Sequence, residues 1–291
     1  MRVAIIGGSG KMGRWFAGFL SKDGKEVVIS GRNKKRLLEI KRQLGVEATT
    51  DLSSAVKGAD AVLLSVPIDS FEAVVKQLQP YIKPDQIVID VTSIKTAPVA
   101  AMHKYLGAGS ILGAHPVFGP GAKGIRNQNI VLTPTNDKEI ALAEGVRQYL
   151  EKRGARVSLM TPQEHDEMIA IILGLAHFIA IAAADTLLNF KGLKQMAAVA
   201  GPTYKVLLTL AESVLTEDPE LYASLQMNLP RVPEIEEQFL KSAKTWADIV
   251  KNKDRQEFIK RMNMLEDRMG QNDPDFGKSY EAMYKILEGL Q

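Results

Sequence analysis

The chain has 291 residues, which is long enough for two domains or for one large domain with a substantial core. Its composition is that of an ordinary globular protein, and a formal net charge of +3 gives no argument for nucleic acid or a membrane as a partner. The absence of cysteine excludes disulfides, thiolate catalysis and cysteine-ligated metals, and we identify no metal site. An apolar strand pattern already includes residue 5, so we expect no signal peptide and a cytoplasmic protein.

The first half of the chain alternates short β-rich runs with amphipathic helical stretches. We predict strands at residues 2–6, 26–30, 59–66, 86–90, 110–115 and 129–134. Apolar strands that alternate with helices are typical of a mostly parallel sheet with both faces covered. The sequence therefore predicts an α/β fold with a Rossmann-type sheet.

After ARVSLM, residues 155–160, the pattern changes to helical periodicity. Thr161 is placed to cap a helix, with Pro162 at the first helical position and Glu164 completing a capping box. From there to the end of the chain we find no convincing strand. We therefore predict two domains, a dinucleotide-binding domain at residues 1–158 and an all-helical domain at residues 159–291.

One apolar segment, residues 168–188, has the composition of a membrane span. Its uninterrupted apolar part is shorter than the roughly 20 residues that a spanning helix needs. It also contains His177 and Asp185, which lie close to one face of a helix. We expect a helix that is buried all round by its own domain or by a partner subunit, and no membrane association.

A glycine pattern, Gly8-x-Gly10-x-x-Gly13, lies directly after the first strand and at the start of a helix. The first glycine allows a tight turn, the second lets a pyrophosphate approach the backbone, and the third lets helix and strand pack closely. The helix N-terminus supplies free amides for the anion. At the start of a βαβ unit this pattern is strong evidence for a dinucleotide site. The predicted cofactor-binding residues of this turn are Gly8, Ser9, Gly10, Lys11, Met12 and Gly13.

The second strand indicates which dinucleotide is bound. About 20 residues past the glycines an NAD site is expected to place an acid on the ribose hydroxyls. Here the sequence offers Ser30 and Arg32, a hydroxyl and a guanidinium that can bind a 2′-phosphate. Lys35 and Arg36 either add to this positive charge or form a solvated helix face. We predict NADP as the cofactor.

Ligands of parallel sheets lie beyond the carboxyl ends of the strands, where polar groups follow three strands of this chain. Pro67 follows the strand at 59–66 and is placed to form a wall beside a nicotinamide. Ser93 and Lys95 follow the strand at 86–90, and His115 ends the strand at 110–115. Lys95 either binds a substrate carboxylate or caps the next helix, and we favour the first interpretation.

A set of motifs runs in order along nearly the whole chain. After the glycine turn come TSIK (92–95), HPVFGP (115–120), EHDEM (164–168), GLAHF (174–178), GPTYK (201–205) and EDPELYASLQMN (217–228). This combination resembles the prephenate dehydrogenase family of tyrosine biosynthesis. The resemblance implies a homodimer with an N-terminal dinucleotide-binding domain and a helical C-terminal domain for substrate binding and dimerisation. It also implies oxidative decarboxylation of prephenate to 4-hydroxyphenylpyruvate, with hydride transfer to the nicotinamide.

The resemblance assigns roles to particular residues. His115 occupies the position of the family's catalytic histidine, and a neutral imidazole suits the removal of a hydroxyl proton near pH 7. Ser93 matches a hydroxyl that helps to orient this histidine and the nicotinamide. Arg231 falls where the family grips a substrate carboxylate, although the prolines that flank it depart from the usual pattern. His177 matches a histidine of the substrate pocket, or is a hydrogen-bonded histidine of the core.

Two further histidines receive structural interpretations. His165 begins the helical part of the chain beside Asp166, and we expect it to tie the helix start to the sheet domain. His103 is expected to be a plain surface histidine.

Three other functions compete with prephenate dehydrogenation. Arogenate is an alternative substrate, but its ammonium group calls for an acid, and the loop after His115 offers Lys123 and Arg126 without a carboxylate. Deazaflavin-dependent NADP reductases share the glycine turn and the serine–arginine pair, but they do not require HPVFGP. A regulatory protein that only senses NADP would need neither His115 nor Ser93.

Overall fold

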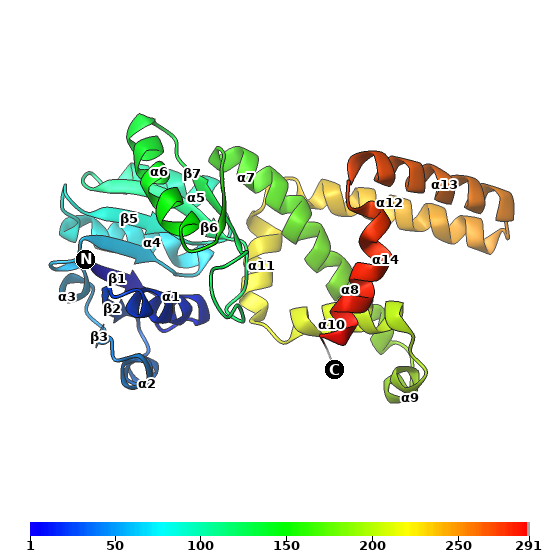
Figure 1. Ribbon diagram of the computed structural model, residues 1–291, viewed down its shortest axis with the longest axis horizontal. Helices are drawn as coiled ribbons and strands as arrows, with labels where there is room; N and C mark the ends of the chain where they lie inside the picture. The colour runs from blue at the N-terminus through cyan, green and yellow to red at the C-terminus, as the bar shows by residue number, and fades with distance from the viewer. Residues whose placement is uncertain (290–291) are drawn as a thin grey trace. The chain divides into compact units, whose positions relative to one another are not determined.

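The computed structural model describes residues 1–289 (Figure 1). The chain divides into two compact units, and the division falls between Ile169 and Ala170. The predicted boundary near residue 158 instead separates strands from helices. The difference is one helix, α7 (Pro162–Ile169), which contacts the sheet unit through α5 (Thr96–Tyr105) and β7 (Asn129–Thr133).

The first unit is built on one eight-stranded sheet with the strand order β3-β2-β1-β4-β5-β6-β7-β8. Its other strands are β1 (Arg2–Ile6), β2 (Glu26–Ser30), β3 (Glu47–Thr49), β4 (Ala61–Leu64), β5 (Ile87–Asp90), β6 (Ser110–Pro116) and β8 (Arg156–Leu159). All neighbouring strands pair in parallel except β6 and β7, which are antiparallel. The predicted mostly parallel sheet is confirmed, whereas the three-residue β3 was missed because it carries no apolar run.

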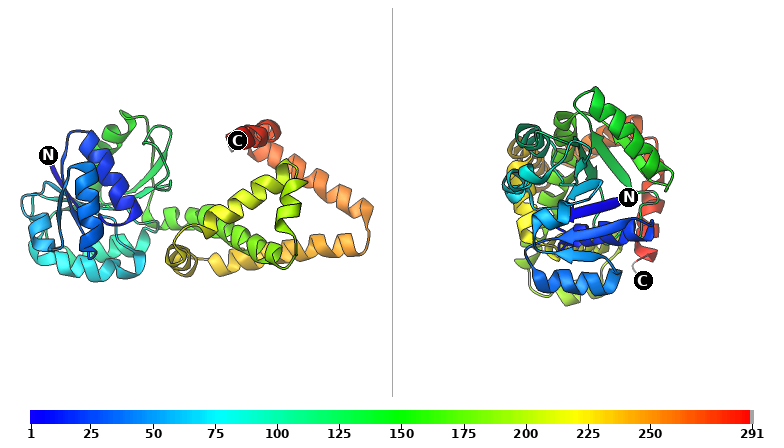
Figure 2. Two further views of the ribbon diagram at one scale, coloured as in Figure 1. Left: turned by 90° about the horizontal axis from the view of Figure 1, so that it is seen from below. Right: turned by 90° about the vertical axis from the view of Figure 1, so that its left-hand side faces the viewer.

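Helices cover both faces of the sheet (Figures 1 and 2). Besides α5 and α7, they are α1 (Lys11–Lys22), α2 (Lys34–Leu44), α3 (Leu52–Val56), α4 (Ile68–Leu78), the 3-10 turn η1 (Gln79–Tyr81) and α6 (Asp137–Glu151). Alternate residues of a strand face opposite sides. Val3 and Ile5 accordingly pack in a cluster with α1 and α2, whereas Ala4 and Ile6 pack with α3, α4 and α5.

The strand order brings four carboxyl ends to one edge of the sheet. The strands β1, β4, β5 and β6 are neighbours and run in parallel. The segments that follow them therefore begin at the same edge. This arrangement places the glycine turn, Pro67, Ser93 and His115 along one side of the sheet, as the sequence predicts.

The turn between β1 and α1 needs glycine at several positions, because a side chain there would collide with neighbouring atoms or would require an unfavourable backbone conformation. Gly7, and not Gly8, has the left-handed conformation, with φ of +85°, so the predicted role of Gly8 in the tight bend belongs to its neighbour. Gly8 is required for another reason, because a Cβ there would lie 2.6 Å from the Cβ of Ile29. A Cβ on Gly13 would lie 2.4 Å from the carbonyl oxygen of Gly7, so the helix packs closely on the turn that follows the strand.

The helix α7 begins as predicted. The Thr161 hydroxyl accepts from the Glu164 amide at 3.2 Å, while the Glu164 carboxylate accepts from the Thr161 amide at 2.8 Å. These reciprocal bonds form the capping box. They satisfy amides that a helix start otherwise leaves without partners.

The second unit consists of helices, and no strand follows β8 in the described part of the chain. Its elements are the π-helical turn η2 (Ala170–Leu175), α8 (Ala176–Leu188), α9 (Leu193–Ala198), α10 (Pro202–Leu215), α11 (Pro219–Asn228), α12 (Val232–Lys251), α13 (Arg255–Asn272), the 3-10 turn η3 (Phe276–Lys278) and α14 (Ser279–Glu288). Within this unit α8 packs against α10, and α12 packs against η2 and α13.

The helical stretch Pro162–Leu188 is long and apolar enough to cross a membrane, judged by length and composition alone. Only 28% of its most apolar part is buried. Ile171, Ile172, Ile181 and Leu188 are all exposed, so the chain does not bury this helix all round by itself. Of the two predicted ways to bury this helix, burial by a partner subunit stays a prediction.

The packing of the glycine turn yields a prediction about stability. Gly13→Ala should lower the free energy of unfolding by about 1–3 kcal/mol, because the new methyl group collides with backbone and forces a shift. Gly145→Ala is the matched control, since nothing lies within 4 Å of the added Cβ in α6. It should raise the free energy of unfolding by about 0.5–1 kcal/mol. Urea unfolding of the cofactor-free proteins measures both values, and equal effects would contradict the packing argument.

Candidate active site

The start of α1 forms a cradle suited to a phosphate. Its N-cap, Gly10, has no side chain that could cap the helix, so no capping side chain competes with an anion for the amides of the first turn. A Cβ on Gly10 would meet only the carbonyl oxygen of Gly7, at 3.3 Å, so the approach to the backbone is open. These features fit the pyrophosphate of a dinucleotide. Ser9 and Met12 are partly exposed beside the cradle.

The end of β2 closes the other side of this turn. The carbonyl oxygen of Ser30 accepts hydrogen bonds from the amides of Gly7 and Gly8, both at 2.9 Å. The Ser30 hydroxyl, however, is fully buried and has no hydrogen-bond partner, so the predicted contact of this hydroxyl with a 2′-phosphate is not supported. The Ser9 hydroxyl, by contrast, belongs to a partly exposed residue and lies beside Gly31, 2.7 Å from where a Cβ on Gly31 would stand. Arg32 is exposed next to them, as its predicted role requires.

Pro67 lies at the carboxyl end of β4, where it is exposed and forms the N-cap of α4. A proline here fixes the backbone in an extended conformation before the helix begins, with φ of −57° and ψ of 146°. This position agrees with the predicted wall beside a nicotinamide.

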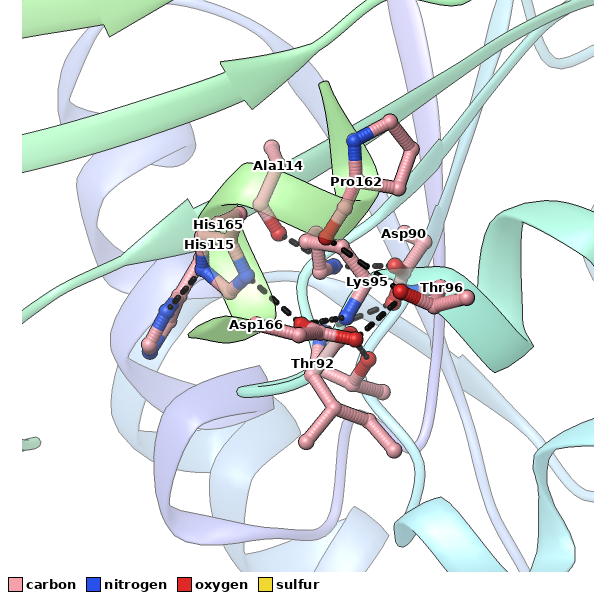
Figure 3. A network of polar contacts seen from close by, with 10 residues as sticks. Asp90, Thr92, Lys95, Thr96, Ala114, His115, Pro162, His165 and Asp166 are labelled. Atoms are coloured by element: carbon pink, nitrogen blue, oxygen red, sulfur yellow. Dashed lines mark hydrogen bonds and ion pairs between the residues drawn. The ribbon is translucent and has the colours of Figure 1, made fainter. Parts of the chain in front are cut away.

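The imidazole of His115 is held by a second histidine (Figure 3). His115 is only 3% exposed, and its Nδ1 lies 2.8 Å from Nε2 of the buried His165 of α7. The other nitrogen of His165, Nδ1, lies 2.7 Å from Oδ1 of Asp166. Nε2 of His115 makes no hydrogen bond within the described residues, yet it is not sealed from solvent. Hydrogen bonds thus hold both nitrogens of His165 and Nδ1 of His115, whereas Nε2 of His115 has no partner among the described residues.

Asp166 joins this pair of histidines to the start of α5. Its Oδ1 accepts from the amide of Lys95 at 2.7 Å, and its Oδ2 accepts from the amide of Thr96 at 2.8 Å. An anion at a helix N-terminus satisfies free amides and interacts favourably with the helix dipole. The expected structural tie between His165–Asp166 and the sheet unit is therefore present. The sequence analysis missed that the same pair also reaches His115.

Lys95 does not have the predicted role of contacting substrate. Its ammonium is fully buried and donates to Asp90 Oδ2 and, at 2.7 Å, to the carbonyl oxygen of Ala114. A substrate carboxylate cannot reach a group enclosed in this way. The alternative of a helix cap is also incomplete, because Lys95 stands at the N-cap of α5 but its side chain makes no capping bond. Lys95 instead connects β5 to β6 beside His115.

Burial controls the protonation of this cluster. It lowers the pKa of His115 well below the usual value of 6.5, and the neighbouring His165 and Lys95 lower it further. Burial also lowers the pKa of His165, against the opposing effect of the Asp166 carboxylate. Both imidazoles are therefore neutral near pH 7. For Asp90 and Lys95, burial raises the carboxyl pKa and lowers the ammonium pKa, while their direct contact opposes both shifts.

Ser93 is partly exposed after β5 and makes no hydrogen bond to His115. The structure therefore does not show the predicted orientation of His115 by Ser93. The residue that hydrogen-bonds to His115 is His165. His103 is exposed as predicted, with its Nε2 2.9 Å from the hydroxyl of Thr135.

Two predicted substrate residues belong to the helical unit. His177 in α8 packs edge-to-face on Tyr222 of α11, with 4.7 Å between ring centroids. Its Nδ1 is buried without a hydrogen-bond partner, which argues against a satisfied core histidine, and burial lowers its pKa. Arg231 is exposed at the N-cap of α12 in the left-handed conformation, with φ of +60°. A positive φ is uncommon for a residue other than glycine and marks a constrained position.

An apolar cavity of about 440 Å³ lies between the sheet and the helices α1 and α6. Ala114 and Pro116, the neighbours of His115, help to line it. Because side chains alternate along a strand, His115 points to the other face of the sheet. The cavity offers almost no polar partner for phosphates or carboxylates, so we do not assign the chemistry to it.

Comparison with known proteins agrees with this geometry. Residues 16–159 match the family described as prephenate dehydrogenase, nucleotide-binding domain, and residues 161–264 match prephenate dehydrogenase, dimerization domain. A protein of Methanocaldococcus jannaschii called a probable arogenate/prephenate dehydrogenase is 35% identical over 265 residues. That match covers 90% of this chain, which spans only 59% of the length of the relative.

More distant matches extend along nearly the whole chain. The T-protein of Haemophilus influenzae is 27% identical over 291 residues, which are all of this chain and 73% of that protein. The crystal structure of prephenate dehydrogenase from A. aeolicus, in complex with hydroxyphenyl propionate and NAD+, superposes with a TM-score of 0.77. It covers 94% of this chain and 98% of that chain at 23% identity, and so demonstrates the shared fold. With both of its domains matched in order along most of its length, the chain belongs to the prephenate dehydrogenase family.

Proposed function

We propose that this protein catalyses the NADP-dependent oxidative decarboxylation of prephenate to 4-hydroxyphenylpyruvate. The observation that carries the proposal is the neutral imidazole of His115, whose open Nε2 lies at the same sheet edge as the glycine cradle of α1. Oxidation of an alcohol removes a proton from its oxygen and a hydride from its carbon. The reaction therefore requires a base and a dinucleotide site close to each other.

The cofactor is assigned to residues of the first unit. The amides at the start of α1 would hold the pyrophosphate, with Ser9, Lys11 and Met12 around it. Ser9 and Arg32 would bind the 2′-phosphate. Pro67 would border the nicotinamide. When the cofactor is bound, its nicotinamide accepts the hydride from C4 of the substrate.

His115 would act as the proton acceptor. A neutral imidazole can accept the proton of the C4 hydroxyl through Nε2 as the C4–O bond gains double-bond character. Carbon dioxide then leaves C1 and the ring becomes aromatic, which makes the overall reaction strongly downhill. The protein therefore has to align the hydroxyl with His115 and hold the charges of the substrate. For the substrate carboxylates we propose Arg231 and His177, as the family resemblance implies.

A homodimer is proposed for the helical unit. The residues matched to a dimerization domain include the exposed apolar side chains of α8 and α10, among them Ile181, Leu188, Leu207 and Leu210. Apolar surface of this kind is typical of subunit interfaces. A cytoplasmic location is proposed with it.

The choice of prephenate over arogenate depends on charge near the substrate side chain. Lys123 and Arg126 are exposed in the loop after β6, and the loop carries no carboxylate that would attract the ammonium of arogenate. We expect kcat/KM to be highest with prephenate and NADP when the formation of NADPH or NADH is followed with each substrate and each nicotinamide cofactor. Faster turnover of arogenate would overturn the substrate assignment, and NADP binding without any turnover would favour a sensing protein.

The cofactor preference can be tested at Arg32. Arg32→Asp should reduce the preference for NADP over NAD by about tenfold or more, because a charge-assisted hydrogen bond to phosphate is replaced by repulsion. Arg42→Asp, the same charge reversal near the far end of α2, is the control and should leave the preference unchanged. Unchanged selectivity in Arg32→Asp would defeat the assignment.

The role of His115 can be tested by His115→Asn. The variant should lower kcat by about 10²–10⁴-fold, the usual contribution of a general base, while the Kd for NADP stays close to that of the wild type. Stopped-flow turnover measures kcat, and isothermal titration calorimetry with NADP measures the Kd. Near-normal turnover would remove the proposed base.

The pH profile provides a second measurement of the same role. Protonation of His115 abolishes its function, so activity should be lost as the pH falls through its pKa, and the lowered pKa puts this loss below pH 6.5. The titratable groups that act on His115 are His165, which is bonded to it, and Lys95. Asp166 is bonded to His165 and Asp90 is bonded to Lys95. The residual activity of His115→Asn should lack this acid limb.

A further inference from the structure

A continuous chain of hydrogen bonds leads from the N-terminus of α5 through Asp166 and His165 to His115 (Figure 3). We propose that Asp166 and His165 are positioning residues that fix the neutral His115 in its Nδ1–H form and leave Nε2 as the proton acceptor. This proposal rests on the proposed function of His115. In it, hydrogen bonding by Asp166 and His165 determines which nitrogen of His115 accepts the proton.

The direction of each hydrogen bond follows from Asp166. The carboxylate accepts from the amides of Lys95 and Thr96, and an ionised carboxylate can only accept. Although burial opposes ionisation, the hydrogen bonds from His165, Thr96 and Lys95 hold the pKa of Asp166 below its usual value. The contact between Asp166 Oδ1 and His165 Nδ1, at 2.7 Å, therefore needs a proton on Nδ1.

The donor in the remaining hydrogen bond, between His165 and His115, then follows because a neutral imidazole carries only one N–H proton. A neutral His165 that carries its proton on Nδ1 has a lone pair on Nε2. That nitrogen lies 2.8 Å from Nδ1 of His115, which must be the donor. With its proton on Nδ1, a neutral His115 has its lone pair on Nε2, the nitrogen that has no hydrogen-bond partner among the described residues. The chain thus selects one of two tautomers.

The backbone around His115 is fixed by a different contact. The ammonium of Lys95 donates to the carbonyl oxygen of Ala114, the residue before His115, and to Asp90 at the end of the neighbouring strand. This contact holds the backbone from which the imidazole projects. Orientation by Lys95 and tautomer selection by His165 and Asp166 are therefore separate functions.

The same chain stabilises the product of proton transfer. When the O–H bond of the substrate hydroxyl breaks, its proton forms a bond to Nε2, and His115 becomes an imidazolium with protons on both nitrogens. Its Nδ1–H still donates to His165, and the negative charge of Asp166 lies at the far end of the chain. An aspartate that orients a basic histidine and stabilises its charged form acts similarly in the serine hydrolase triad.

The direct test is nitrogen NMR on the full chain labelled with ¹⁵N-histidine, which contains only four histidines. Long-range ¹H–¹⁵N spectra distinguish the two neutral tautomers, and comparison with His115→Asn assigns the His115 signals. We expect the Nδ1–H form for both His115 and His165 in the wild-type protein at pH 7.5. An Nε2–H form of His115 in the wild type would overturn the proposal, whether or not any variant folds.

Variants of His165 add a kinetic readout. His165→Phe should remove the tautomer preference of His115 and lower kcat by about 10–100-fold, the scale of partners that orient a reactive imidazole, with little change in the Kd for NADP. His165→Gln keeps an acceptor oxygen in reach and should restore most of kcat. His103→Phe, at the exposed histidine, is the control and should change neither quantity. Equal kcat and an unchanged tautomer in His165→Phe would contradict the proposal.

The two hypotheses fail in different ways. If His115→Asn keeps its activity while NMR finds the Nδ1–H form, the proposed base is wrong but the selection of the tautomer stands. If His115→Asn is inactive while NMR finds the Nε2–H form, the base stands and the positioning role of His165 and Asp166 is wrong.

Discussion

The hydrogen bond between Nδ1 of His115 and Nε2 of His165 is the interaction on which the proposed chemistry depends. It joins a strand of the sheet to the first helix after the last strand, across 50 positions of sequence. Because Asp166 anchors His165 and also caps α5, the orientation of one imidazole depends on the packing of α7 against α5. A buried polar network of this kind has value only when every member has a partner. Here the one open atom is the nitrogen that the reaction would use.

The ion pair of Lys95 and Asp90 provides the second constraint. Both groups are fully buried, so each would be costly alone, and removing one partner of a buried pair typically costs about 3–5 kcal/mol. The pair links the carboxyl end of β5 to the backbone of β6. The positive charge of Lys95 also lowers the pKa of His115, which helps to keep that imidazole neutral. Lys95, which the sequence suggested as a substrate ligand, is better explained as a support for the backbone of β6.

The sequence predicts most of the fold, because strand periodicity, the glycine turn and the Thr161–Glu164 capping box are local patterns. It also locates the edge of the sheet at which we propose the chemistry, since topology alone brings the ends of parallel strands together. Contacts that depend on tertiary packing were not accessible in this way. The pairing of His165 with His115 and the burial of Ser30 and Lys95 required coordinates. The glycine spacing likewise did not reveal that Gly7, rather than Gly8, adopts the positive φ. An acid at the end of a buried strand, such as Asp90, followed five residues later by a lysine, was a usable indication of the ion pair.

The central claim is that Nε2 of His115 takes the proton of the substrate hydroxyl. A crystal structure of the protein with NADP and an unreactive analogue that carries a 4-hydroxyl group tests it most directly. The account predicts that Nε2, and not Nδ1, lies about 2.6–3.2 Å from the hydroxyl oxygen, with Nδ1 still bonded to His165. A hydroxyl bound beyond the reach of His115, or bonded to Nδ1 after the contact with His165 has broken, would contradict it.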